Sequence, residues 1–114
     1  MFTFEDETFD TEFDISLGLK LSTQNPVVIV LTGADLGKRY LLQEASSVIG
    51  RNPAKADIVI TDNTVSGMHS RIDYNPREQQ YFITDLKSRN GILVNSKKTN
   101  NSPLTNGDKI FIGA

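Results

Sequence analysis

The chain has 114 residues, which is the size of one domain and too short for two independent cores. It has no cysteine, no apolar run of the roughly 18 residues that a transmembrane helix needs, and an acidic start unlike a signal peptide, so we expect a soluble cytoplasmic protein without a membrane partner. The formal charge of −2 hides an asymmetry, because residues 1–24 carry six acids and one base whereas residues 25–114 carry eleven bases and eight acids.

The acidic N-terminal segment, residues 1–24, divides into two parts. Residues 13–21 have apolar side chains at every second position, from Phe13 to Leu21, which is the period of a β-strand. Residues 1–12 lack that period and hold most of the acids, so we expect a mobile tail there. A wholly disordered extension is the alternative.

From residue 25 onward, short β-rich runs bounded by Gly, Pro, Asn and Asp recur about every eight to twelve residues, and helical periodicity is nearly absent. The predicted strands cover residues 27–31, 38–42, 47–49, 57–60, 70–74, 80–84, 92–94 and 109–112. Turn-forming sequences lie at residues 33–37, 75–78 and 106–108. This pattern predicts an all-β fold, a two-sheet antiparallel β-sandwich with an acidic N-terminal extension.

Three short signatures fall in the loops of this predicted sandwich. Gly50-Arg51 follows one strand, Ser66-Gly67-Met68-His69 begins fifteen positions after Arg51, and Ser88-Arg89-Asn90-Gly91 follows the strand that ends at Thr84. Their order and spacing resemble the forkhead-associated (FHA) domain, and the resemblance covers roughly residues 27–112. It implies a module of a bacterial signalling protein that binds phosphothreonine in peptides.

A phosphothreonine carries a charge of about −1.5 to −2 and three strong acceptors, so its site needs a fixed fork of donors plus hydroxyl or backbone donors. The resemblance implies that Arg51 grips the phosphate, that Gly50 allows the sharp turn before it, and that Ser66 donates its hydroxyl to a second oxygen. In the alternative interpretation, Arg51 is a surface residue paired with Asp57 or Asp62, and Ser66 only bonds its own backbone.

The third signature has the same kind of implied roles. By resemblance, Asn90 binds the main chain of the peptide, Arg89 adds a phosphate contact, and Ser88 and Gly91 support the loop. A plain hairpin turn at Asn90-Gly91 is compatible with this role. Ile92 departs from the family pattern, which usually has threonine there, and we expect this change to affect loop stability more than ligand choice.

Position 67 also departs from the pattern. The family usually has a polar side chain there that reaches the ligand, whereas Gly67 offers only its backbone N–H. His69 is the only histidine, and without a cysteine or a second histidine it indicates neither a metal site nor a catalytic relay. We expect no cofactor, and the resemblance implies that His69 braces the phosphate-binding loop from beneath.

By resemblance, residues 25–114 form the FHA domain. The family usually has one further strand at the end, which closes the sandwich beside the first strand, and we expect that strand to be missing here. We expect residues 13–21 to cover that open edge, within the molecule or by exchange with a neighbour. By analogy with bacterial modules of similar appearance, we expect this domain to control an attached effector domain, such as a diguanylate cyclase.

The acidic tail itself contains candidate ligands at Thr3, Thr8 and Thr11. We hypothesise that a serine/threonine kinase phosphorylates the tail, at Thr11 or Thr8 in preference to Thr3. The modified tail then docks on the phosphate site in cis or in trans, and the short tether raises its effective concentration.

Three other function classes compete with phosphopeptide recognition. An enzyme is disfavoured because the sequence has no nucleotide-binding glycine loop, metal cluster or activated nucleophile. Nucleic-acid binding is disfavoured by the acidic tail and the modest positive charge of residues 25–114. A phosphate-independent protein-interaction or oligomerisation module stays open as the alternative.

Overall fold

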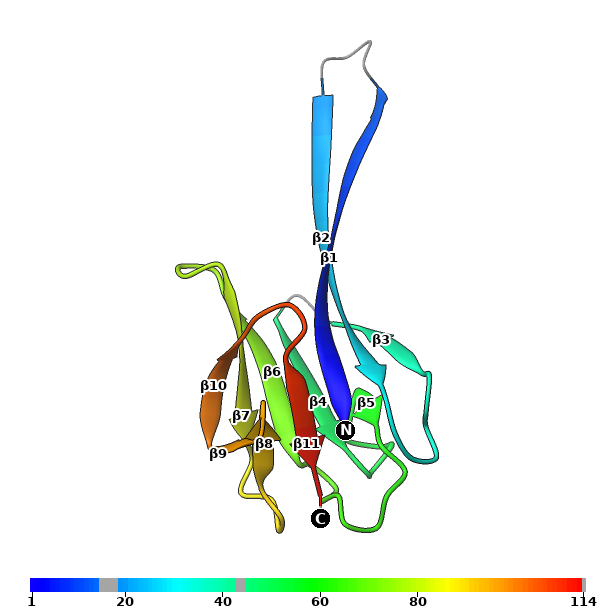
Figure 1. Ribbon diagram of the computed structural model, residues 1–114, viewed down its shortest axis with the longest axis vertical. Helices are drawn as coiled ribbons and strands as arrows, with labels where there is room; N and C mark the ends of the chain where they lie inside the picture. Colours follow the sequence, from blue (N-terminus) through cyan, green and yellow to red (C-terminus); the bar gives the residue numbers. More distant parts are fainter. Residues whose placement is uncertain (15–18, 43–44, 114) are drawn as a thin grey trace.

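Two stacked β-sheets make up the computed structural model, which describes residues 1–14, 19–42 and 45–113 (Figure 1). Within these residues there is no helix, and eleven strands are present. They are β1 (Phe2–Asp14), β2 (Leu19–Val30), β3 (Arg39–Leu41), β4 (Ser46–Gly50), β5 (Ile58–Val59), β6 (Ser70–Asn75), β7 (Gln80–Asp85), β8 (Ile92–Val94), β9 (Lys97–Thr99), β10 (Asn101–Leu104) and β11 (Lys109–Ile112).

The first sheet has the strand order β3-β2-β1-β11-β8-β9, and the second has the order β10-β7-β6-β4-β5. All neighbouring strands are antiparallel except β4 and β5, which pair in parallel, Ile49 beside Ile58. The predicted all-β sandwich is therefore confirmed, with one parallel pair that the sequence pattern did not predict.

The core lies between the two sheets and is built from alternate residues of nearly every strand. Its buried members are Phe2, Phe4, Val28, Leu42, Ile49, Ile58, Val65, Ile72, Ile83, Ile92, Val94, Leu104, Ile110 and Ile112. Phe4 connects the layers directly, because its ring centre lies 5.7 Å from that of Tyr81 in β7. The loops that carry the sequence signatures are thus anchored on a continuous apolar core.

The first residues of the chain differ from the mobile tail that the sequence predicts. Phe2 and Phe4 are each 1% exposed, and β1 pairs with β11 through Phe2 beside Ile110. On its other side β1 pairs with β2 from Phe2 beside Val30 onward. The strand β1 therefore lies between β2 and β11. Residues of β1 from Phe2 onward, and not residues 13–21, cover the sheet edge beside the first predicted strand of the domain. The alternation of Phe2 and Phe4 is too short to stand out among the acids that follow.

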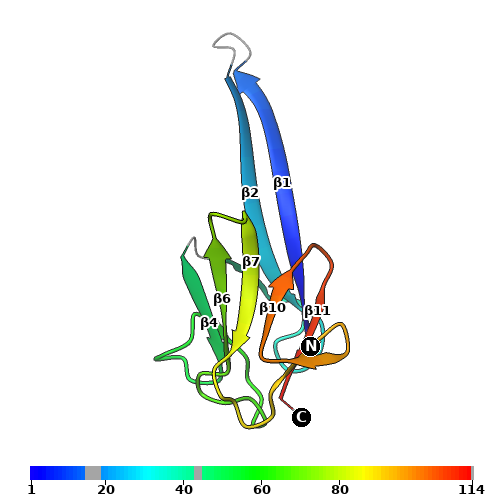
Figure 2. The ribbon, with the colours of Figure 1, turned by 90° about the vertical axis from the view of Figure 1, so that its left-hand side faces the viewer.

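The predicted strand over residues 13–21 is also wrong in its bounds. The strand β1 ends at Asp14 and β2 begins at Leu19, while residues 15–18 lie outside the described residues. The strand β2 then continues to Val30, so the expected domain boundary at residue 25 falls inside a strand. Outer parts of β1 and β2 project beyond the sandwich as a two-stranded ribbon (Figures 1 and 2).

The sequence pattern missed β9 and β10, which contain mainly polar residues. Both lie at sheet edges, and among their residues only Leu104 is buried, so these strands carry almost no apolar pattern. Pro103 is compatible with an edge strand because it has no N–H to donate to a second neighbour.

No helix in the described part of the chain is long and apolar enough to cross a membrane.

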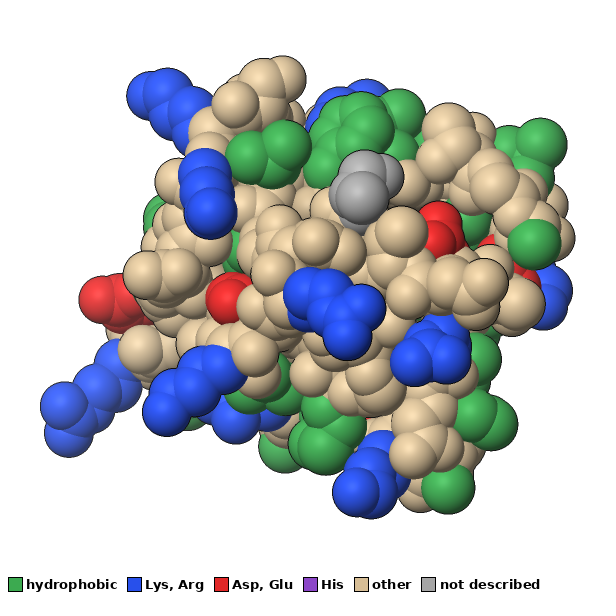
Figure 3. Space-filling view, turned by 90° about the horizontal axis from the view of Figure 1, so that it is seen from below, with side chains coloured by type: hydrophobic (Ala, Val, Ile, Leu, Met, Phe, Trp, Pro, Cys, Tyr) green, Lys and Arg blue, Asp and Glu red, His purple; other side chains and the backbone are tan. Residues whose placement is uncertain are grey.

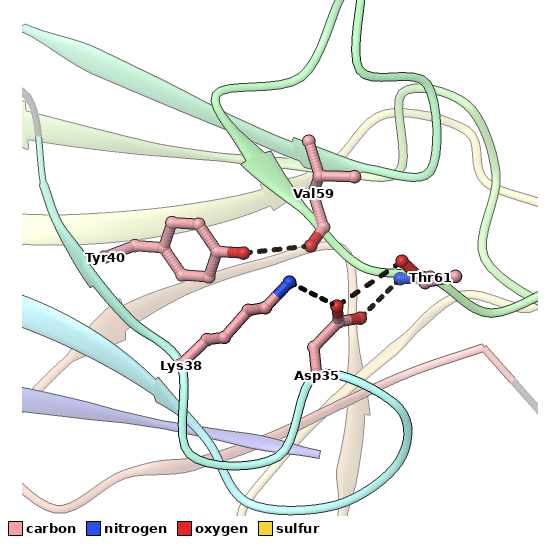
Figure 4. A network of polar contacts seen from close by, with 5 residues as sticks. All are labelled: Asp35, Lys38, Tyr40, Val59 and Thr61. Carbon is pink, nitrogen blue, oxygen red and sulfur yellow. Dashed lines mark hydrogen bonds and ion pairs between the residues drawn. The ribbon is translucent and has the colours of Figure 1, made fainter.

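A polar network ties the two sheets together near the end of β5 (Figure 4). Asp35, in the turn between β2 and β3, is only 4% exposed, and its carboxylate accepts the backbone N–H of Thr61 at 2.6 Å. Lys38 donates to the same carboxylate at 3.1 Å. The Thr61 hydrogen bond, with Lys38 as a further contributor, lowers the pKa of Asp35. In addition, the Tyr40 hydroxyl donates to the Val59 carbonyl at 3.2 Å.

Candidate functional site

Three loops meet at the end of the sandwich opposite the projecting ribbon (Figure 1). They follow β4, β5 and β7, and together they enclose an open pocket of about 230 Å³. Its lining residues are Arg51, Asn63, Thr64, Val65, Ser66, Gly67 and Arg89. Lys and Arg side chains are spread over this end of the molecule (Figure 3).

Gly50 allows the first two loops to approach each other closely. A Cβ at this position would overlap the carbonyl oxygen of Gly67, so no other residue fits without a backbone shift. Two backbone hydrogen bonds then join the loops. The Arg51 N–H donates to the Ser66 carbonyl at 3.0 Å, and the Asn52 N–H donates to the Gly67 carbonyl at 3.2 Å. The predicted supporting role of Gly50 therefore has a steric basis in this structure.

The Arg51 side chain is exposed and oriented toward the pocket loop. Its Nε donates to the Val65 carbonyl at 3.0 Å, which fixes the plane of the guanidinium. Asp57 and Asp62 do not pair with it: the Asp57 carboxylate accepts Val48 N–H, and the Asp62 carboxylate accepts Thr64 N–H, both at 2.8 Å. Within the described residues Arg51 makes no ion pair, so its charge is available to a ligand.

Ser66 connects the second and third loops. Its Oγ accepts the Arg89 N–H at 3.0 Å, which leaves the hydroxyl proton available as a donor. The Arg89 side chain is exposed and lines the same pocket. The structure therefore brings Arg51, Ser66 and Arg89 together, as expected of three phosphate-binding residues.

His69 is completely buried and holds two loops at once. Its Nδ1 accepts the Ser66 N–H at 3.0 Å, and its Nε2 lies 2.8 Å from the Gly91 carbonyl. The first contact requires an unprotonated Nδ1, and the second requires a protonated Nε2 that donates to the carbonyl. The Ser66 N–H and the Gly91 carbonyl therefore determine the tautomer of the His69 imidazole. Its place beneath Ser66 agrees with the bracing role, and no ligand can reach it directly. Figure 3 accordingly shows no histidine on this face.

The third loop is fixed by a short chain of hydrogen bonds. The Ser88 hydroxyl donates to Asp85, and the Gly91 N–H donates to Ser88 Oγ at 2.9 Å. Gly91 has a φ of 75°, a conformation that glycine adopts without steric cost. Asn90 is exposed, and its Nδ2 donates to the Thr64 carbonyl at 2.8 Å. Asn90 therefore lies across from the second loop with its side-chain oxygen available to accept.

Three pocket residues were missed by the sequence reasoning: Asn63, Thr64 and Val65. Asp62 accepts both the backbone N–H and the hydroxyl of Thr64, the latter at 2.7 Å, and these bonds lower the pKa of Asp62. The Asp-Asn-Thr run was a readable signal for such a side-chain-capped turn. Its position beside Ser66 could not be read from composition.

The candidate phosphorylation sites lie away from the pocket. Thr3 is 3% exposed, and its hydroxyl contacts Glu5, the Asp108 carbonyl and the Lys109 ammonium group. Thr8 and Thr11 lie in the projecting part of β1, beside Gln24 and Leu21 of β2. The structure does not bring any of the three to Arg51.

Among the described residues there is no group of three or more His, Cys, Asp or Glu placed to hold a metal ion.

Comparison with protein families identifies the architecture. A family model described as the FHA domain matches residues 47–113, which include all three loop signatures. The chain belongs to the FHA family. A curated relative, the oxoglutarate dehydrogenase inhibitor of Corynebacterium jeikeium, is 38% identical over 87 residues, 76% of this chain and 58% of its own length. The glycogen accumulation regulator GarA of Mycobacterium tuberculosis is 32% identical over 103 residues, 90% of this chain and 62% of its own length.

The FHA chain therefore spans about three-fifths of the length of these curated relatives. Solved structures agree with the family assignment. The FHA domain of the CT664 protein from Chlamydia trachomatis superimposes with a TM-score of 0.71 at 28% identity, covering 78% of this chain and 89% of the other. An FHA domain from a study of phosphothreonine-dependent interactions gives a TM-score of 0.70 at 31% identity, covering 78% and 88%.

Proposed function

We propose that this FHA domain is a signalling module that binds phosphothreonine-containing segments of protein partners at the pocket between its three loops. The observation that carries the proposal is that Arg51, Ser66 and Arg89 line one pocket of about 230 Å³ whose lining contains no acid. Arg51 and Arg89 would hold phosphate oxygens, and Ser66 would donate to another. The Gly67 N–H and the Asn90 amide complete the predicted contacts with phosphate and peptide backbone.

The expected affinity follows from the number of such contacts. Two or three charge-assisted hydrogen bonds of about 1.5 to 3 kcal/mol each, less the cost of ordering the peptide, give a dissociation constant in the micromolar range. The threonine methyl adds about 0.8 kcal/mol if it is buried, which is roughly a fourfold preference over phosphoserine. Binding of this strength is reversible and depends on the kinase that modifies the partner.

Calorimetric titration with one peptide in phosphorylated and plain forms tests the proposal. We expect binding of the phosphothreonine form alone, and its loss in Arg51→Ala. The matched control is Arg77→Ala, which removes an equal charge from the exposed turn between β6 and β7. Equal affinity for both peptide forms would instead support a phosphate-independent interaction module.

The names of the relatives suggest the kind of partner. One is an inhibitor of oxoglutarate dehydrogenase and another a regulator of glycogen accumulation, so we propose that this chain likewise acts by binding and controlling another protein. An attached effector such as a diguanylate cyclase stays a prediction from the sequence.

A kinase-modified Thr8 or Thr11 is a second ligand proposal. Because the projecting ribbon and the pocket lie at opposite ends of the molecule, docking between two molecules suits the geometry better than docking within one (Figure 1). A peptide covering residues 5–14 and phosphorylated at either threonine should bind the intact chain and fail to bind Arg51→Ala. The intact chain is required because Phe2 and Phe4 belong to the core. No binding of either phosphopeptide, while an unrelated phosphothreonine peptide binds, would reject this ligand alone.

A further inference from the structure

The projecting ribbon, here called the arm, consists of residues 6–14 of β1 and 19–25 of β2. Its strands pair from Asp6 beside Pro26 to Asp14 beside Leu19, with an irregularity between Thr11 and Asp14. Both views show the arm extending away from the sandwich, and the molecule measures 53 × 29 × 26 Å (Figures 1 and 2). A two-stranded ribbon alone is at best marginally stable in water, so an arm of this length calls for a partner.

Both edges of the arm present unpaired backbone within the described structure. The strand β3 pairs with β2 at Val27, Val28 and Ile29, and β11 pairs with β1 at Phe2 and Thr3. No described strand continues either pairing along the arm. Such edges form intermolecular sheets unless charge, proline or a bulge prevents it.

The two edges differ sharply in charge. In β1, residues 6–14 contain five acids and no base. Residues 19–25 of β2 contain a single charge, Lys20, together with Leu, Ser, Thr, Gln and Asn. Antiparallel pairing of two β1 edges would bring the acids of both copies together, whereas two β2 edges can pair without such repulsion.

Backbone direction identifies the groups that β2 offers to a partner. The Val30 N–H donates to Lys38, and the Pro26 carbonyl accepts the Leu42 N–H, so even-numbered residues of β2 face the β3 side. Because hydrogen-bonding direction alternates along a strand, the backbone N–H and C=O groups of Lys20, Ser22 and Gln24 point to the same side, which is unpaired within the arm. Pro26 has no N–H to donate, and the pairing of β2 with β3 begins at the next residue, Val27.

From this asymmetry we propose that a second copy of this chain pairs with the β2 edge of the arm. Residues 19–25 of the two copies run antiparallel about a twofold axis, and the two arms form a four-stranded sheet with β2 strands at its centre. The interface is isologous and therefore closes as a dimer. It is separate from the three-loop pocket and independent of phosphate.

Sedimentation analysis of the full chain, with proline placed on one edge at a time, tests the proposal. Ser22→Pro removes an N–H that faces the partner and leaves the pairing of β2 with β1 intact. We expect wild type and Ser22→Ala to be dimers and Ser22→Pro to be a monomer. Thr8→Pro is the matched control, because even-numbered residues of β1 face away from β2, as the Phe4 N–H to Asp108 bond shows. This variant should stay a dimer.

Three results would overturn the proposal. The first is a wild-type chain that stays monomeric at the highest attainable concentration. The second is a Ser22→Pro chain that stays a dimer. The third is loss of association in Thr8→Pro as well as in Ser22→Pro, which would indicate head-to-tail pairing of β1 with β2. Thermal unfolding of each variant separates loss of the interface from loss of the fold. Phosphopeptide titration is not used, so failure here leaves the proposed function untouched.

Discussion

Gly67 lines the pocket beside Arg51 without contributing a side chain. A Cβ at this position would meet only the Asn52 Cβ, at an ordinary 3.5 Å, and no positive φ is imposed on Gly67. We therefore expect Gly67→Arg to fold normally and to bind a phosphothreonine peptide up to roughly fivefold more tightly. A charge-assisted bond contributes about 1.5 to 3 kcal/mol, and ordering the arginine side chain costs about 2 kcal/mol, so the net gain is at most about 1 kcal/mol. Calorimetry on Gly67→Arg and Gly67→Ala checks it, and an equal gain in both would refute the added contact.

At the same scale, the sequence indicated the side chains of the proposed site more readily than the backbone groups that orient them. The motif spacing indicated Arg51, Ser66, Arg89 and Asn90, whose places in the loops agree with it. The backbone carbonyl of Val65 that orients Arg51 carries no sequence signal, because any residue supplies a carbonyl. Contacts of this kind become visible only when the loops are placed together.

At the scale of elements, β1 is the strand on which the first sheet depends. Phe4 is 1% exposed and packs on Tyr81 of the opposite sheet. We expect Phe4→Ala to lower the free energy of unfolding by about 3 to 5 kcal/mol, because removal of this large core side chain leaves a cavity. Phe111→Ala is the matched control: Phe111 is 43% exposed, so its loss should cost about 1 kcal/mol or less. Urea unfolding measures both, and similar losses would mean that β1 does not anchor the core.

The strands that were predicted correctly are those whose side chains must alternate or be buried. The strands β6 and β7 are internal to the second sheet, and their apolar residues marked them clearly. The N-terminal strands were misjudged for a different reason. Only Phe2 and Phe4 contact the core in β1, and the acids that follow belong to an arm beyond it. A local period count cannot separate these two environments, because one strand passes through both.

For the whole molecule, Asp35 links stability to pH because its carboxylate joins the two sheets through Thr61. The pKa of Asp35 is lowered in the folded state, first by the Thr61 N–H and then by Lys38. The folded pKa therefore lies below the unfolded pKa. The contribution of the carboxylate to the free energy of unfolding is full above its ordinary pKa and is lost as pH falls through the folded pKa.

Asn at position 35 can accept the same N–H but does not titrate. The wild-type chain should thus be more stable than Asp35→Asn at neutral pH, and the two unfolding free energies should converge below about pH 4. Asp62 has a lowered pKa too, but it is present in both proteins and cancels in the difference. Urea unfolding across the acid range measures that difference directly, and a difference that stays constant with pH would show that the link between the sheets does not depend on the charge of Asp35.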